Sequence, residues 1–145
     1  TGIGLEVDVN CAKPVPGLIK GSANNHYQVV DLLLQQPGID VNIRRGSSYA
    51  TALYVACQEN NIEIVRRLLS RADIDVNAAT SNGNGVTALH IAAHRGHVDC
   101  VKLLLDCSAL DVNKKTNSGH TAIALAVWDN HRAVDELLIR DQRTQ

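Results

Sequence analysis

Three histidines and one cysteine lie close together in this chain and could bind a metal ion. His90, His94, His97 and Cys100 are spaced by four, three and three residues, a spacing that places side chains on one face of a continuous helix. Imidazole nitrogen and thiolate sulfur are common zinc ligands, so zinc-dependent chemistry is one hypothesis for this segment. Gly96 argues against a continuous helix here. We therefore predict no metal site and no cofactor.

A cysteine nucleophile with a histidine base is a second chemical hypothesis. Such a pair needs a neighbouring pocket that stabilises an oxyanion, and the sequence gives no sign of one. Cys57 and Cys100 fall at predicted core positions, and Cys107 lies near a predicted helix end. The glycine-rich segment 82–85 has no preceding hydrophobic strand and lacks the lysine of a phosphate-binding loop. We therefore predict that the chain is not an enzyme.

Charge, apolar runs and cysteine usage exclude several classes of partner. The chain has 14 Lys and Arg against 15 Asp and Glu, which does not favour a nucleic-acid or anionic-membrane binder. Its apolar runs are far shorter than the roughly 20 residues of a membrane-spanning helix. The four cysteines have neither zinc-ribbon nor C-x-x-C spacing. We expect a soluble monomer in a reducing compartment inside the cell, the cytoplasm or the nucleus.

The elements that would position these residues follow from an internal repeat. The tripeptide Asp-Val-Asn begins at Asp8, Asp40, Asp75 and Asp111, and its last three copies are 35 and 36 residues apart. A second marker, Thr-Ala-Leu or Thr-Ala-Ile, begins at Thr51, Thr87 and Thr121, with a degenerate copy at Pro16. Because both markers keep nearly the same period, the chain is predicted to repeat one supersecondary unit.

Each unit has the apolar spacing of two short amphipathic helices. The threonine before each first helix is a suitable N-cap, and Pro16 is compatible with a helix start in the first unit. The position predicted to turn between the two helices favours a left-handed backbone. The residues at this position are Asn25, Asn60, Gly96 and Asn130. Cys100 is aligned with the predicted core residues Val29, Ile64 and Ala133.

The segment from Thr87 to His97, followed by a leucine-rich helix and Asp111-Val-Asn113, closely resembles an ankyrin repeat. The resemblance covers about residues 8–139. It implies an all-α solenoid of stacked helix-turn-helix units joined by β-hairpin loops, one domain over residues 1–145. The approximate units are 8–42, 43–77, 78–113 and 114–145, with the first and last as caps. Tyr49 replaces the usual hairpin glycine, so we expect altered hairpin tips.

The resemblance also implies a function, because the family binds proteins on a concave face built from hairpin tips and first helices. The chain is therefore predicted to be a non-catalytic scaffold for a protein partner. The predicted contact residues are Arg44, Arg45, Tyr49, Gln58, Glu59, His94, Arg95, Asn117, Ser118, His120, Trp128 and Asp129. Trp128 and Tyr49 are the predicted anchors, although each could instead pack against its own unit.

Two further expectations accompany the scaffold hypothesis. Asn42, Asn77 and Asn113 each follow Asp-Val and have a leucine eight residues earlier, which resembles the target of asparaginyl β-hydroxylation in ankyrin repeats of animal cells. The same asparagines could simply hold the hairpins to their neighbours. The alternative function is a regulatory or targeting domain of a larger enzyme, or a pathogen effector that acts in the host cytoplasm.

Overall fold

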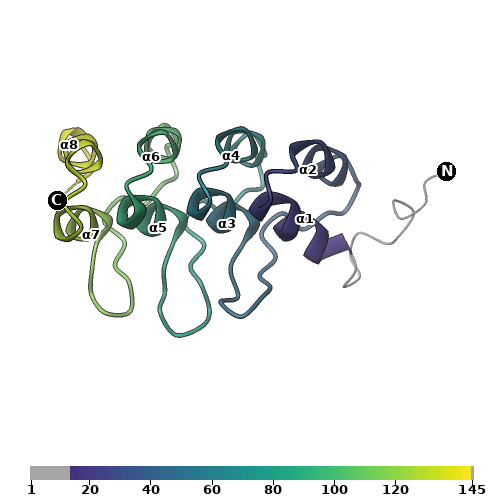
Figure 1. Cartoon of the computed structure of the whole chain (residues 1–145), viewed down its shortest axis with the longest axis horizontal. Coiled ribbons are helices and arrows are strands. Elements are labelled where there is room, and N and C mark those ends of the chain that lie inside the picture. The colour runs from purple at the N-terminus through teal and green to yellow at the C-terminus, as the bar shows by residue number, and fades with distance from the viewer. Residues whose placement is uncertain (1–13, 145) are drawn as a thin grey trace.

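Four helix pairs stack side by side in this protein. The computed structural model describes residues 14–144. It contains eight helices within that range, α1 (Pro14–Ala23), α2 (Tyr27–Leu34), α3 (Ala52–Gln58), α4 (Ile62–Leu69), α5 (Ala88–Arg95), α6 (Val98–Leu105), α7 (Ala122–Trp128) and α8 (Arg132–Arg140). The first helices of the pairs form one row and the second helices form another, and long loops project beside the first row (Figure 1). The predicted all-α solenoid is confirmed, while the first Asp-Val-Asn copy at Asp8 lies outside the described residues.

The predicted helix starts agree with the structure in three of the four pairs. Thr51, Thr87 and Thr121 are N-caps, and each hydroxyl accepts a bond from the backbone N–H three residues later, at 3.2, 3.3 and 3.3 Å. The first helix begins at Pro14, two residues before the predicted start at Pro16. Both prolines lie in the first turn, where the missing N–H costs little.

Each pair turns at one residue with a left-handed backbone. The φ angles of Asn25, Asn60, Gly96 and Asn130 are 58°, 59°, 72° and 59°, as predicted for this aligned position. L-residues other than asparagine pay a steric cost in this conformation. Gly96 thus ends α5, and the histidines and cysteine of the metal hypothesis are divided between α5 and α6.

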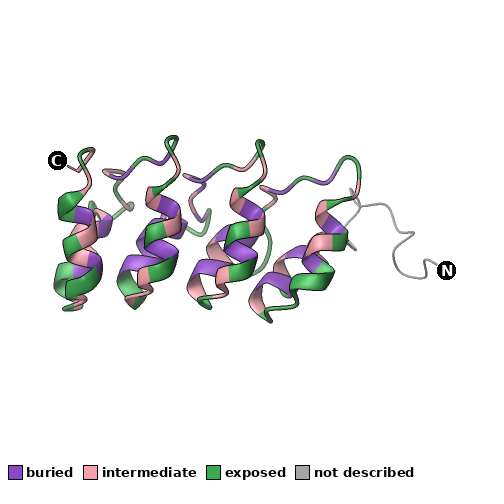
Figure 2. Cartoon of the chain, turned by 90° about the horizontal axis from the view of Figure 1, so that it is seen from above, coloured by how far each residue is buried: buried purple, intermediate pink, exposed green. Residues whose placement is uncertain are grey.

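The core lies between successive pairs, where purple buried positions face one another (Figure 2). Ile64 and Cys100 have no exposed surface, as predicted. Two residues predicted at the same aligned position are exposed instead. In the fourth pair Val134 is buried and Ala133 is exposed, because the fourth unit follows the third at 34 residues. Val29 is 44% exposed, since no other described pair lies beyond α1 and α2 to cover it.

Asparagine side chains bridge successive pairs. The amide of Asn42 donates to Asp73 O at 2.7 Å and accepts from Asp75 N at 2.7 Å. Asn77 makes the same two bonds with Ala109 O and Asp111 N, at 2.8 and 2.7 Å. The third copy, Asn113, donates to Arg143 O at 2.5 Å. Each amide satisfies backbone groups that would otherwise lack a protein partner.

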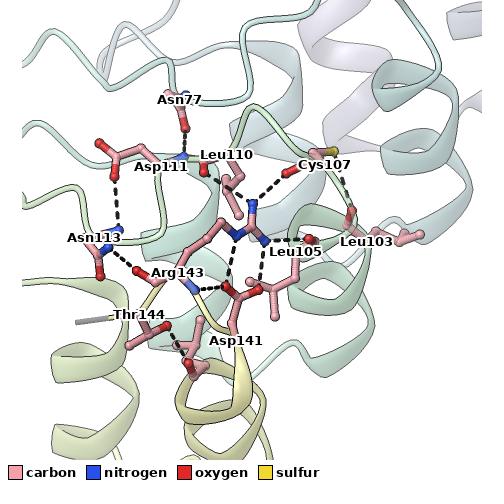
Figure 3. A network of polar contacts seen from close by, with 11 residues as sticks. Asn77, Leu103, Leu105, Cys107, Leu110, Asp111, Asn113, Asp141, Arg143 and Thr144 are labelled. Carbon is pink, nitrogen blue, oxygen red and sulfur yellow. Dashed lines mark hydrogen bonds and ion pairs between the residues drawn. The ribbon is translucent and has the colours of Figure 1, made fainter.

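The segment after α8 packs against the third pair. Arg143 donates to the carbonyls of Cys107 and Leu105 at 2.9 and 2.7 Å, and its guanidinium also pairs with Asp141 (Figure 3). Arginine has the several donors that this arrangement requires. Leu105 is the last residue of α6 and Cys107 lies two residues beyond it, so Arg143 satisfies a carbonyl that the helix end leaves unpaired.

The predicted β-hairpin loops form without strands in the described part of the chain. Hairpin loop 43–51 has a single β-bridge between Arg45 and Ala50. In loops 78–87 and 114–121, one backbone bond closes each hairpin at 2.9 and 2.8 Å. The position of Tyr49 is left-handed in all three loops, with φ of 50° at Tyr49, 63° at Gly85 and 86° at Gly119. The altered tip is therefore a tyrosine in a conformation that normally favours glycine.

Asp135 provides a test of this packing. It is aligned with the buried residues Val65 and Val101, and its Oδ1 atom is buried without a partner among the described groups. Because an unpaired buried acceptor is destabilising, Asp135→Val is expected to raise the free energy of unfolding by about 1 kcal/mol. Urea denaturation measures this change. A matched Glu136→Val variant changes an exposed residue and should give no gain; an equal gain from both would contradict the explanation.

Candidate functional site

The residues of the metal hypothesis have separate hydrogen-bond partners. His90 Nδ1 accepts from Thr87 N at 3.0 Å, and its Nε2 lies 2.7 Å from Lys114 O, which fixes Nε2 as the donor. His97 Nδ1 donates to Cys57 O at 2.8 Å. The Cys100 thiol donates to Asn60 Oδ1, and His94 bonds to the carboxylate of Asp129. Within residues 14–144, no group of three or more His, Cys, Asp or Glu side chains is placed to hold a metal ion.

Cys57 and Cys107 have the environment of structural thiols rather than of nucleophiles, whereas the hydrogen bond with Cys57 lowers the pKa of Cys100, a fully buried side chain. Cys57 and Cys100 are buried and free, and Cys107 is half-buried and free. The neighbouring Cys100 thiol and burial raise the pKa of Cys57, and burial raises the pKa of Cys107. A thiol with a raised pKa is mostly protonated at neutral pH, whereas the thiolate is the reactive form. These two side chains are therefore poorly suited to nucleophilic catalysis.

We expect His90 to make the stability of the fold depend on pH. Burial lowers the pKa of His90 below its ordinary value. As the pH falls from about 7.5 to about 5.5, the unfolded chain takes up this proton before the folded chain does, so the free energy of unfolding should fall. Urea denaturation at both pH values measures the loss. His90→Gln should make the loss of unfolding free energy smaller, because glutamine keeps the capping-box interaction without a titrating ring. An unchanged loss in this variant would show that His90 does not cause the pH dependence.

All twelve predicted contact residues lie on one face of the molecule. We call this the loop face and define it as the first helices α1, α3, α5 and α7, the turns that follow them, and hairpin loops 43–51, 78–87 and 114–121 (Figure 1). The opposite, second-helix face comprises α2, α4, α6 and α8 with the segments that follow them. Trp128, Arg95 and Tyr49 are exposed on the loop face, and Trp128 is the most exposed large hydrophobic residue there, at 76%.

The loop face has a pocket between the third and fourth pairs. Its volume is about 270 Å³. The predicted residues His94, Ser118 and His120 line it. The other lining residues, which the sequence did not place together, are Tyr54, Asn84, Val86, His90, Ile91, Thr116 and Leu125. Its lining combines apolar and aromatic side chains with several polar ones, and both kinds are found in binding pockets.

Contacts between the two pairs set the shape of this pocket. The Asn117 amide donates to Gly83 O at 2.8 Å, and its backbone N–H donates to Asn84 O at 3.0 Å. Hairpin loops 78–87 and 114–121 are thereby joined. Asn117 was predicted as a contact residue, but its side-chain amide donates to the neighbouring loop.

Two side-chain pairs border the pocket. His94 Nδ1 lies 2.5 Å from a carboxylate oxygen of Asp129, which links α5 to the turn after α7. The His120 and Trp128 rings meet edge to face, with centroids 5.8 Å apart and planes at 78°, a favoured aromatic geometry. One side of Trp128 also borders a shallow apolar hollow with Ile123 and Val127. Hairpin loop 114–121 thus positions Trp128 through His120, while most of the Trp128 surface stays exposed.

The remaining predicted residues lie on the same face but do not line the pocket. Arg44, Arg45 and Tyr49 belong to hairpin loop 43–51, beside the second pair. Gln58 and Glu59 lie at the end of α3. The structure therefore divides the predicted site into two groups. The pocket group, on the third and fourth pairs, contains the predicted residues in or beside the pocket. The hairpin group contains Arg44, Arg45 and Tyr49 of hairpin loop 43–51, beside the second pair.

No helix in the described residues is both long enough and apolar enough to cross a bilayer.

Comparison with known proteins identifies the repeat. A family described as "Ankyrin repeats (3 copies)" matches residues 6–80 and 53–145. A similar protein from Caenorhabditis elegans, "Ankyrin repeat and KH domain-containing protein mask-1", is 42% identical over 52 residues. The matched part is 36% of this chain but 2% of that protein, so the chain covers a small part of its length.

Proposed function

Because this chain belongs to the ankyrin repeat family, whose repeats are generally protein–protein interaction modules, we propose that it binds a protein partner through its loop face. The observation that carries the proposal is the pocket between the third and fourth pairs, with Trp128 exposed beside it. Tryptophan is enriched at the energetic centres of protein interfaces. An exposed tryptophan ring does not gain the favourable free energy of removing its apolar surface from water. A partner that covers the ring would gain this free energy on binding.

The conformation of Tyr49 also supports the loop face as the binding surface. Its φ is 50° where the other two hairpins have glycine, and its side chain is 55% exposed. Strained residues persist more often at functional sites than elsewhere. Packing within the chain gives little compensation for this strain, because most of the ring is in solvent. We interpret Tyr49 as a contact residue of the hairpin group.

The proposed role is non-catalytic, and we propose that the protein acts inside the cell. Ankyrin repeats are typically non-catalytic modules, and His90 and His97 bond to backbone carbonyls of neighbouring segments while Cys57 and Cys100 are buried in the core. Three free cysteines are typical of a reducing compartment.

Affinity capture from cell lysate tests the proposal. The parent domain is compared with a Tyr49→Gly, Trp128→Ala variant, in which glycine suits the left-handed backbone and alanine removes an exposed ring. An Arg132→Ala, Ile139→Ala variant is the matched control, since both residues are exposed on α8. Circular dichroism and urea denaturation confirm that all three proteins are folded.

We expect the parent and the control to retain the same discrete protein and the loop-face variant to lose it. Equal retention by all three proteins, or loss from the control alone, would show that the partner does not use this face. If the parent retains no discrete protein, the scaffold proposal fails and a regulatory role within a larger protein becomes the better hypothesis.

The bridging asparagines are proposed sites of β-hydroxylation. The side chains of Asn42 and Asn77 each make two bonds to the following segment, so the modifying enzyme would need that bridge to open. Intact-mass analysis after exposure to an asparaginyl hydroxylase should show the addition of oxygen. An unchanged mass in the urea-unfolded and the folded chain would refute the proposal.

A further inference from the structure

Formal charge is divided unequally between the two faces of the molecule. Among the described residues, the loop face has six Lys and Arg against two Asp and Glu, a formal charge of plus four. The second-helix face has seven Lys and Arg against eleven Asp and Glu, a formal charge of minus four. The near-zero net charge of the whole chain therefore conceals a cationic and an anionic face.

The ion pairs make the contrast in unpaired cations between the two faces larger than the formal charges alone indicate. In residues 14–144, every ion pair between an arginine and a carboxylate lies on the second-helix face, as in Arg67 with Asp31 and Arg143 with Asp141. The loop-face cations Arg44, Arg45 and Arg95 are exposed and form no ion pair within the described part of the chain. Of the two loop-face carboxylates, Asp129 is already bonded to His94. Unpaired cations therefore dominate this surface.

One of these cations lies beside the pocket between the third and fourth pairs. Arg95 directly follows His94, which lines the pocket together with the apolar residues Ile91 and Leu125. Arg44 and Arg45 extend the cationic surface to hairpin loop 43–51. A partner matched to this surface has carboxylates along its length and one apolar side chain that enters the pocket, because complementary charge is the general rule at interfaces.

We propose that the loop face recognises an acidic polypeptide segment with an apolar anchor residue. This inference rests on the proposed function and names the chemistry of its partner. A polypeptide fits better than a nucleic acid, because it can combine carboxylates with an apolar side chain that enters the pocket, whereas the nucleic-acid backbone presents only charged phosphates to the cations.

Fluorescence anisotropy with synthetic probes tests this chemistry directly. The probe is a short fluorescein-labelled peptide of Glu and Ser with one central Leu. One matched peptide has Gln in place of every Glu, a second has Ala in place of Leu, and a thymidine oligonucleotide of equal charge represents nucleic acid. Each is titrated with the domain at about 50 and about 300 mM NaCl, because the higher salt concentration shortens the screening length to less than half, by about 2.4-fold.

The Glu peptide should bind, the Gln peptide should not, and the higher salt concentration and the Leu-to-Ala change should each weaken binding. Arg45→Gln with Arg95→Gln should reduce affinity for the Glu peptide by about tenfold. The control is Arg132→Gln with Arg140→Gln, which removes two exposed arginines from α8 and should leave affinity unchanged or raise it.

Four results would overturn the inference: no binding of the Glu peptide, equal binding of the Glu and Gln peptides, tighter binding of the oligonucleotide, or equal losses in the two variants. The lysate capture distinguishes these failures from failure of the proposed function. A partner that depends on Tyr49 and Trp128 would keep the loop face as a binding surface even if the acidic probe does not bind.

Discussion

Asn77→Ala is expected to lower the free energy of unfolding by about 2 kcal/mol, because it leaves two backbone groups of the next pair without their side-chain partner. The amide donates to Ala109 O at 2.8 Å and accepts from Asp111 N at 2.7 Å. Both bonds lie near solvent, so water compensates part of the loss. The remaining effect is large because the bonds join the second pair to the third, and a solenoid is stabilised by contacts between neighbours.

Urea denaturation followed by circular dichroism measures this loss. Asn82→Ala is the matched control, since Asn82 Oδ1 accepts only a local bond, from Asn84 N at 3.2 Å, in an exposed loop. We expect a change of less than about 0.5 kcal/mol there. Asn77→Ala should also broaden the transition, because weaker coupling lets the pairs on either side unfold separately. Equal effects of the two substitutions would contradict a bridging role for Asn77.

Trp128→Ala is expected to weaken binding of the captured partner about thirtyfold, which corresponds to about 2 kcal/mol, the cost typical of truncating an interface hot spot. The ring is 76% exposed, and its edge-to-face contact with His120 leaves most of its surface free for a partner. The stability of the domain should change little, because an exposed side chain contributes little to folding.

Titration calorimetry with the purified partner measures this affinity. Ile139→Ala is the control, because Ile139 is a large apolar residue that is 63% exposed on α8. Its affinity for the partner should match that of the parent. If Trp128→Ala binds as tightly as Ile139→Ala, Trp128 is not an anchor, and if it lowers stability by more than about 1 kcal/mol, it packs within the domain instead.

The repeating features of the fold could be predicted from the sequence because each has a local physical cause. Thr87 precedes a helix and caps it, and Asn60 occurs where the backbone must be left-handed. Such requirements recur in every pair and therefore produce a period in the sequence. The errors occurred where the period changes, as at Ala133, or where no described neighbour covers the surface, as at Val29.

The pocket could be predicted only in part because it depends on contacts that do not repeat. Asn117 joins two hairpin loops, and His94 reaches Asp129 of the next pair. Neither combination of residue types, asparagine with a glycine carbonyl or histidine with a carboxylate, recurs between the second and third pairs, so alignment of the repeats gives no signal for these contacts. The sequence could place His94, His120 and Trp128 on one face, but the structure was needed to show that His94 and His120 line one pocket and that Trp128 lies against His120.

Site-specific photo-crosslinking in cell lysate tests most directly whether the loop face is the binding surface. A photoreactive amino acid is placed at Ser118, which lines the pocket, or at Ser108, which is exposed beyond α6 on the second-helix face. Binding through the loop face predicts one discrete protein adduct from Ser118 and none from Ser108. An adduct from Ser108 alone, or the same adduct in equal yield from both positions, would contradict it.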